Sequence, residues 1–227
     1  MVIGNGMMAT AFKELKNDDT VIIFASGVSN SKEKDPEAYQ KELAMLDNLK
    51  HSPTTLVYFS TCSVFDDSLS DSLYVKHKKD TEKFIEANFK NYWIIRLPNV
   101  IGPSYNPHTM MNFLYEVLKN DRPFELQENA VRYFIDVDDV RITVGEMVKN
   151  KELGSGMYNL LYPYPFTMLE LVKLLETSFS KKGLYTIKKN AGSFYKVKIS
   201  EQLVPLAHFN MAEQQNYICR IIDKYYK

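Results

Sequence analysis

Two side chains four positions apart, Tyr74 and Lys78, are suited to proton transfer. On a helix this spacing places both on one face. A phenol with an ordinary pKa of about 10 is a poor acid–base group at neutral pH, and an adjacent ammonium lowers that pKa by favouring the phenolate. Such a pair can move a proton at a carbinol or carbonyl oxygen while a nicotinamide moves the hydride. Thr61, at the end of an expected strand, could hold the same substrate oxygen.

The spacing alone does not single out this pair. The same interval separates two other tyrosines from lysines, in the pairs Tyr115/Lys119 and Tyr185/Lys189. We expect Tyr115 to be a core or helix-surface aromatic residue and Tyr185 to be a strand residue. Tyr74 differs because it opens an expected helix shortly after a buried strand that ends in Ser60-Thr61. A purely structural role for Tyr74 is the alternative that the residues leave open.

A glycine turn near the N-terminus has the pattern G-x-G-x-x-[G/A], formed by Gly4, Gly6 and Ala9. Gly4 permits a tight turn, and Gly6 lets the backbone approach a pyrophosphate. Ala9 keeps helix and strand close, and the helix N-terminus offers amide donors. A plain tight turn is the alternative interpretation, because glycine turns before helices are common.

One part of a dinucleotide-binding pattern is missing. An acidic residue roughly 20 positions further on usually binds the adenosine ribose of NAD. Here that interval holds an expected strand, Thr20–Ala25, which runs into Ser26-Gly27 without an acidic residue. Asp18 and Asp19 precede this strand, at its wrong end. The pattern therefore selects neither NAD nor NADP, and adenosine recognition has no assigned residue.

Apolar, β-branched runs alternate with amphipathic stretches along the first half of the chain. This alternation predicts a mainly parallel α/β sheet. We expect strands over Thr20–Ala25, Thr55–Ser60 and Tyr92–Arg96, and helices over Thr10–Lys16, Asp35–Lys50 and Tyr74–Asn88. Further on we expect helices near Thr109–Lys119, Asp136–Lys149, Thr167–Ser178 and Met211–Tyr225, with β-like pieces in Phe124–Ile135 and a strand at Gly156–Leu160.

The composition is that of a globular protein, with 45% hydrophobic and 25% charged residues among 227. Basic and acidic residues balance at 28 each, so no overall field suggests a nucleic-acid partner. No apolar run reaches the roughly 18 residues of a membrane span, and no signal segment is evident. Two distant cysteines, Cys62 and Cys219, and four scattered histidines predict neither a disulfide framework nor a metal site. We expect a cytoplasmic enzyme.

Several segments, in order, resemble the extended short-chain dehydrogenase/reductases, the NAD-dependent epimerase/dehydratase family. They are Gly4–Ala9, Phe24–Gly27, Phe59–Phe65, Tyr74–Lys78, Arg96–Pro103, Arg132–Val140, and Tyr158-Asn159 followed by Thr167–Leu171. The resemblance covers about residues 1–175. It implies a Rossmann-like, doubly wound parallel sheet lacking two of the usual strands, with a small C-terminal substrate lobe. Residues 1–102 would form the dinucleotide-binding core and 103–227 mostly the lobe, with parts of 136–160 returning to the core.

The resemblance also implies roles for individual residues. Tyr74 would be the acid/base, Lys78 would lower its pKa and bind the ribose, and Thr61 would bind the substrate oxygen. NAD or NADP would be held by Gly4, Asn5, Gly6, Met7, Met8, Ala25, Ser26, Gly27, Ser60, Tyr74, Lys78 and Pro98. The substrate would contact Thr61, Cys62, Ser63, Asn99 and Arg132. Arg132 would hold a substrate phosphate or else pair with Asp136 or Asp138.

Departures from the family pattern narrow the expected chemistry. Cys62-Ser63 replaces the Asp-Glu pair that performs elimination in the family's dehydratases, so that reaction is disfavoured. Cys62 is expected to be a small buried residue rather than a nucleophile, because no histidine is placed to activate it. The short loop between Thr61 and Tyr74 implies an open or small substrate entrance.

The expected function is therefore an NAD(P)-dependent epimerase or ketoreductase acting on a nucleotide-linked sugar. A non-catalytic NAD(P)-binding sensor or scaffold of the same fold is the alternative, and a protein that has lost the cofactor altogether is a third. The resemblance also implies a homodimer, because the family often dimerises through helices that match Asp35–Lys50 and Tyr74–Asn88. Both segments have apolar faces, which packing within the chain explains equally well.

Overall fold

A parallel sheet of five strands forms the centre of the computed structural model, which describes residues 1–104, 106–150 and 153–227. Its strand order is β1-β2-β3-β4-β9, and all neighbouring strands pair in parallel. The strands are β1 (Val2–Ile3), β2 (Val21–Phe24), β3 (Thr55–Thr61), β4 (Tyr92–Leu97) and β9 (Gly156–Asn159). All four residues of β2 are buried, as its continuous apolar run predicts for a strand covered on both faces.

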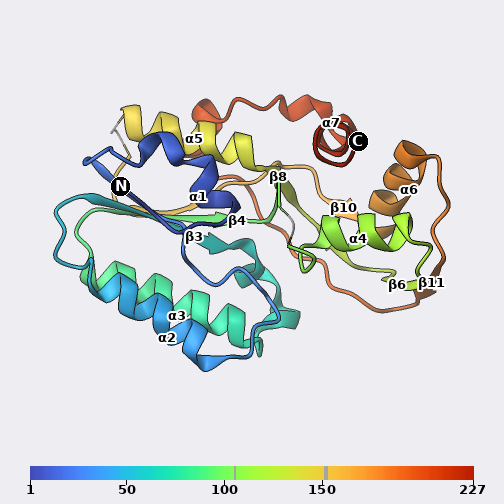
Figure 1. The fold of residues 1–227 in the computed structure, drawn as a ribbon, viewed down its shortest axis with the longest axis horizontal. Helices are drawn as coiled ribbons and strands as arrows, with labels where there is room; N and C mark the ends of the chain where they lie inside the picture. The colour runs from blue at the N-terminus through green and yellow to red at the C-terminus, as the bar shows by residue number, and fades with distance from the viewer. Residues whose placement is uncertain (105, 151–152) are drawn as a thin grey trace.

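Helices cover both faces of this sheet (Figure 1). The helices α2 (Pro36–Asp47) and α3 (Leu73–Asn88) lie side by side on one face, and α1 (Met7–Ala11) and α5 (Val137–Asn150) lie on the other. Alternating strand residues separate two apolar cores. Ile22, Leu56 and Ile94 pack with the α2 and α3 side, whereas Ile23, Val57 and Ile95 belong to the larger core that includes α5.

The predicted doubly wound, Rossmann-like architecture is therefore confirmed. β1 forms one edge of the sheet, and the described chain places no strand beyond it. This arrangement agrees with the expected lack of two strands, because the glycine turn then follows an edge strand.

Beyond β4 the chain builds smaller elements beside the main sheet (Figure 1). The helices are α4 (Met110–Lys119), α6 (Met168–Phe179) and α7 (Gln215–Tyr226). Two-stranded sheets join β5 (Asn99–Ile101) to β8 (Phe134–Asp136), β6 (Phe124–Gln127) to β11 (Tyr185–Lys188), and β7 (Val131–Arg132) to β10 (Phe166–Thr167). Short 3-10 helices span Lys13–Leu15, Cys62–Phe65, Asp67–Leu69, Glu201–Leu206 and Met211–Glu213. The described residues include no helix both long and apolar enough to cross a membrane.

Two predicted helices differ from their observed form. The helix expected over Thr10–Lys16 starts earlier, at Met7, and ends at Ala11 before a 3-10 turn. Phe12, the residue at the break, is buried and its ring stacks on Phe59 with 5.5 Å between centroids. Burial of this ring therefore takes precedence over helix continuation. Near the C-terminus, Gln214 has φ of +48°, which separates the turn at Met211–Glu213 from α7.

Candidate active site

Thr61 and Tyr74 meet at the carboxyl end of β3. Thr61 is the last residue of that strand, and its hydroxyl accepts a hydrogen bond of 3.1 Å from the Ser63 amide. Tyr74 lies in the first turn of α3, close enough to Thr61 for the two side chains to interact. Both side chains are buried. Open parallel sheets bind ligands at the carboxyl ends of their strands, so a site is expected at this end of the sheet.

Lys78 lies one turn further along α3 and is buried among polar partners. Its Nζ is 2.8 Å from the Tyr58 hydroxyl oxygen and 3.1 Å from Glu42 Oε1. The same atom is 5.9 Å from the centroid of the Tyr74 ring. The helix thus brings Tyr74 and Lys78 together, but the direct partners of the ammonium are Glu42 and Tyr58.

The pKa of Tyr74 is raised overall in this structure, and a lowering by Lys78 stays a prediction. Burial raises the pKa of Tyr74 to about 12, although the interaction with Thr61 lowers it and the charge of Glu42 raises it further. The carboxylate of Glu42 offsets the positive charge of Lys78, with 3.1 Å between the paired atoms. Tyr74 is therefore a neutral phenol at physiological pH.

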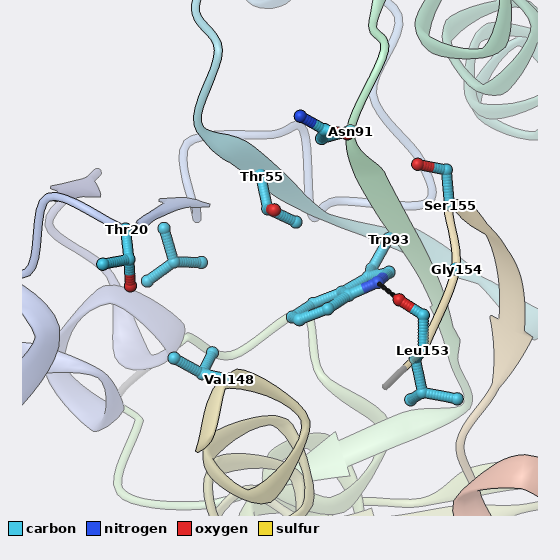
Figure 2. A pocket seen from close by; sticks show the side chains of 9 residues that line it. Thr20, Thr55, Asn91, Trp93, Val148, Leu153, Gly154 and Ser155 are labelled. Atoms are coloured by element: carbon cyan, nitrogen blue, oxygen red, sulfur yellow. Dashed lines mark hydrogen bonds between the residues drawn. The ribbon is translucent and has the colours of Figure 1, made fainter. Parts of the chain in front are cut away.

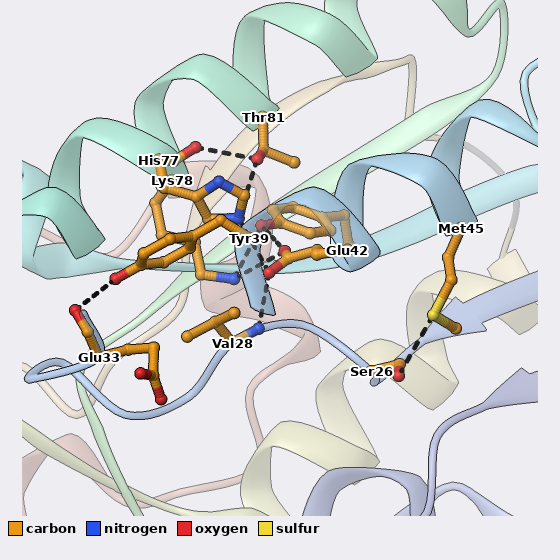
Figure 3. A network of polar contacts seen from close by, with 10 residues as sticks. Ser26, Val28, Glu33, Tyr39, Glu42, Met45, His77, Lys78 and Thr81 are labelled. Atoms are coloured by element: carbon orange, nitrogen blue, oxygen red, sulfur yellow. Dashed lines mark hydrogen bonds and ion pairs between the residues drawn. The ribbon is translucent and has the colours of Figure 1, made fainter. Parts of the chain in front are cut away.

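Glu42 is a site residue that sequence reasoning missed. Its carboxylate is 1% exposed and accepts hydrogen bonds from the Val28 amide at 2.6 Å and the Tyr58 hydroxyl at 2.6 Å. His77 Nε2 lies 3.0 Å from Glu42 Oε2, whereas Lys78 contacts Oε1 (Figure 3). Burial acts to raise the pKa of Glu42, but His77, Lys78, Tyr58 and Val28 together lower it to about 2.

A signal for this residue was present in the sequence. Glu42 is three positions after Tyr39 and four before Leu46, which places a carboxylate on the apolar face of α2. An acidic residue on such a face indicates a buried partner, because an unpaired charge there is costly. The sequence alone did not identify that partner, since Tyr58 and Lys78 come from other elements.

The glycine turn lies against the end of β2. Gly4 has φ of +126°, and a Cβ there would lie 2.4 Å from the Ala25 carbonyl oxygen. Gly6 is exposed, and no atom lies within 4 Å of the place of its missing Cβ. Ala9 is buried at the start of the following helix. Gly4 thus fixes a close backbone crossing, while Gly6 leaves the backbone open to a ligand.

The segment after β2 links this turn to Lys78. A Cβ on Gly27 would lie 2.9 Å from both Glu42 Oε1 and Lys78 Nζ. The neighbouring Ser26 hydroxyl lies 3.8 Å from the sulfur of Met45 (Figure 3). Ala25, Ser26 and Gly27 therefore lie between the glycine turn and the Tyr74–Lys78 pair.

The remaining residues expected at a cofactor are more dispersed. The Ser60 hydroxyl donates a hydrogen bond of 2.6 Å to Glu82. Met7 lies close to Gly102, where a Cβ would meet its sulfur at 2.9 Å. Met8 packs against the larger core, Asn5 is exposed in the glycine turn, and Pro98 separates β4 from β5.

The residues expected at a substrate lie around Tyr133. Asn99 donates a hydrogen bond of 3.0 Å to the Tyr133 carbonyl from its side-chain amide. Cys62 is fully buried in the cluster that contains Tyr133, and burial raises the pKa of its thiol to about 12. The geometry therefore favours the small buried residue over the nucleophile. Ser63 contributes its backbone amide to Thr61.

Arg132 does not make the ion pair that was one of its two expected roles. Its guanidinium donates to the carbonyl oxygens of Val131 at 2.8 Å and Ser193 at 3.4 Å. Lys224 of α7 pairs instead with Asp136 at 2.8 Å and Asp138 at 2.6 Å. A role for Arg132 at a substrate phosphate stays a prediction.

A cavity of about 280 Å³ lies at the opposite end of the strands from Thr61 and Tyr74 (Figure 2). Its lining includes Thr20, Thr55, Trp93 and Ser155, which stand near the amino ends of the strands. Neither Thr61 nor Tyr74 lines it, so it is separate from the site at the carboxyl ends. Among the described residues, no group of three or more His, Cys, Asp and Glu side chains could hold a metal ion.

Comparison with known proteins identifies the fold through structure alone. No protein-family model matches the sequence, and a search of curated proteins gives no match. A UDP-glucuronic acid 4-epimerase from Bacillus cereus, in complex with UDP-glucuronic acid and NAD, superimposes with a TM-score of 0.70 at 17% identity, over 94% of this chain and 78% of that chain. A dTDP-4-dehydrorhamnose reductase from Clostridium acetobutylicum has a TM-score of 0.70 at 15% identity, over 96% and 85% of the two chains.

A third similar structure is RMD from Pseudomonas aeruginosa complexed with NADPH, with a TM-score of 0.63 at 15% identity over 90% of this chain and 82% of that chain. These enzymes share the extended short-chain dehydrogenase/reductase fold, and the predicted resemblance is confirmed at the level of fold.

Proposed function

We propose that this chain is an NAD- or NADP-dependent enzyme that epimerises or reduces a nucleotide-linked sugar, with Tyr74 as the proton-transfer residue. The observation that carries the proposal is the contact between Thr61 and Tyr74 at the carboxyl ends of the strands, with Lys78 one helical turn from Tyr74. The similar structures support the substrate class, because one holds UDP-glucuronic acid and NAD.

The glycine turn and the segment after β2 fit part of a dinucleotide. Gly6 offers an open backbone where a pyrophosphate could approach, and Ala25–Gly27 leads from there toward Tyr74. β1 is the sheet edge, so no described strand is available to line an adenosine beyond it. Bound in this way, the dinucleotide would supply or accept the hydride.

A neutral Tyr74 suits the role of proton donor in a reduction. A neutral phenol can donate its proton to a carbonyl oxygen as that oxygen gains negative charge. The Thr61 hydroxyl, beside Tyr74, would hold the same oxygen. Lys78, with its Nζ 5.9 Å from the Tyr74 ring, would stabilise the phenolate left behind.

The test is turnover of a panel of keto-sugar nucleotides with NADH and NADPH. Tyr74→Phe removes the hydroxyl and should reduce kcat by at least about 100-fold, the range of a lost acid–base group. Its circular dichroism should match the wild type, which shows that the variant is folded. Tyr115→Phe is the matched control, because Tyr115 has the same spacing from a lysine and packs on Phe179 in the lobe. Normal turnover by Tyr74→Phe would contradict the proposal.

A second candidate is a non-catalytic NAD(P)-binding protein of the same fold. The contacts of Lys78 support this second candidate, because its ammonium is already hydrogen-bonded to Glu42 and Tyr58. Cofactor binding without turnover across the panel would support this candidate. Titrations in which neither NADH nor NADPH binds would support loss of the cofactor.

A further inference from the structure

Glu42 joins three separate parts of the site through one buried carboxylate (Figure 3). It contacts the backbone after β2 at Val28, the strand β3 at Tyr58, and the helix α3 at His77 and Lys78. Each contact is between 2.6 and 3.1 Å, and the carboxylate is 1% exposed. Taking two charges out of water is costly, so neither charge of this buried pair can be removed without leaving the other uncompensated.

The ammonium of Lys78 has little freedom in this arrangement. It lies 2.8 Å from the Tyr58 hydroxyl and 4.8 Å from the centroid of that ring. Gly27 also lies against the ammonium, because a Cβ on this glycine would come within 2.9 Å of Lys78 Nζ. Glu42 is the partner that carries the opposite charge at contact distance.

We propose that Glu42 is a positioning residue for the reaction, which acts through Lys78 by holding the ammonium charged and fixed between Tyr58 and Tyr74. The inference rests on the proposed function, in which Lys78 supports Tyr74. Through Glu42, helix α2 would contribute to the site in addition to Thr61, Tyr74 and Lys78.

Electrostatics give this role a measurable sign. Burial lowers the pKa of Lys78, while Glu42 and, less strongly, Glu82 raise it. Tyr74 faces Thr61, Glu42, Tyr39 and Cys62, and the charge of Glu42 raises its pKa. Replacing Glu42 by glutamine keeps an acceptor but removes the charge. Both Lys78 and Tyr74 should then lose their protons at lower pH.

The first experiment follows the Lys78 ammonium by nitrogen-15 NMR in the free protein, with its resonance assigned by its loss in Lys78→Met. In Glu42→Gln the titration midpoint of Lys78 should fall by at least about one pH unit, or tenfold in proton affinity, the size expected for losing a charge at contact distance. Glu176→Gln is the matched control, because Glu176 is also a buried carboxylate paired with a lysine, Lys173, and bonded to a backbone amide. An unchanged midpoint in Glu42→Gln would overturn the inference.

A second variant covers the case in which Glu42→Gln does not fold. Tyr58→Phe removes the neutral partner of Lys78 and leaves Glu42 in place. If Glu42 keeps the ammonium charged, the midpoint in Tyr58→Phe stays within about half a pH unit of the wild type, below the shift expected for a lost charge. A fall of a full unit or more in this variant would show that Tyr58 has the role assigned to Glu42.

The catalytic readout separates this inference from the proposed function. With a reactive keto-sugar nucleotide, the alkaline limb of the kcat/KM profile should move to lower pH in Glu42→Gln. In Glu42→Asp the charge is kept, so the limb should stay while kcat falls. An inactive wild type would overturn the proposed function and with it this role in a reaction, whereas an active enzyme whose limb does not move in Glu42→Gln would overturn the role of Glu42 alone.

Discussion

At the scale of single residues, we expect Gly4 to be important for stability and Gly6 for ligand binding. Gly4→Ala should destabilise the fold by about 1–3 kcal/mol or more, because alanine is strained at φ of +126° and its Cβ would meet the Ala25 carbonyl at 2.4 Å. Gly6→Ala has no atom within 4 Å of its Cβ and should unfold in urea like the wild type. If Gly6 faces a pyrophosphate, Gly6→Ala should nevertheless bind NADH or NADPH at least about tenfold more weakly than the wild type does. This corresponds to a loss of about 1.4 kcal/mol of binding free energy. Equal stability of the two variants would contradict the assigned geometry.

The same scale shows what the sequence could and could not predict about the site. That Thr61 ends a strand and that Tyr74 and Lys78 lie one turn apart on a helix follow from local patterns, and the structure shows both. The charge state of Tyr74 does not follow from them, because it depends on burial and on Glu42 from another helix. Pairing with Asp136 or Asp138 was one of two expected roles of Arg132, but Lys224 contacts Asp136 from a helix 88 positions away in the sequence. Long-range partners of this kind are not visible in residue spacing.

At the scale of elements, α7 is attached to the core by a buried tyrosine. The ring of Tyr217 stacks on Tyr162 at 3.7 Å, and its hydroxyl donates to Asp139 at 2.6 Å while accepting from the Asp136 amide at 2.9 Å. Tyr217→Phe should cost about 1–3 kcal/mol, because it leaves a buried amide and a carboxylate without this partner. Urea unfolding measures the loss.

Tyr164→Phe serves as the control for this change. Tyr164 packs edge-on against Phe166, a contact that phenylalanine keeps, and no hydrogen bond is described for its hydroxyl. A loss below about 0.5 kcal/mol for Tyr217→Phe, typical of an uninvolved surface change, would show that the hydrogen bonds of Tyr217 contribute little to the attachment of α7.

Element type was predictable wherever the pattern was long. The apolar runs at β2, β3 and β4 and the helices α2 and α3 follow their expected positions closely, and Asp35 caps α2 through the Glu37 amide. The short helix α1 was not, because the buried ring of Phe12 ends it after five residues. Tertiary packing overrides propensity most easily in such short elements.

At the scale of the whole molecule, Glu42 should make the fold sensitive to acid. Its pKa is about 2 in the folded protein against an ordinary 4.5, so its contribution to stability is present above pH 4.5 and is lost as the pH falls toward 2. Linkage gives about 3 kcal/mol for this change at full extent. The free energy of unfolding of the wild type relative to Glu42→Gln should therefore be larger at pH 6 than near pH 2 by up to that amount. Parallel urea titrations measure it, and a pH-independent difference would contradict it.

The edge position of β1 has a further consequence, for solubility. Among the described strands none lies beyond β1, and unpaired edges are templates on which other chains can aggregate. The chain leaves this edge at Gly4, directly after Ile3. Short edge strands are one of the ways in which proteins reduce this hazard. By ending β1, Gly4 limits on this side the length of strand with which another chain could pair.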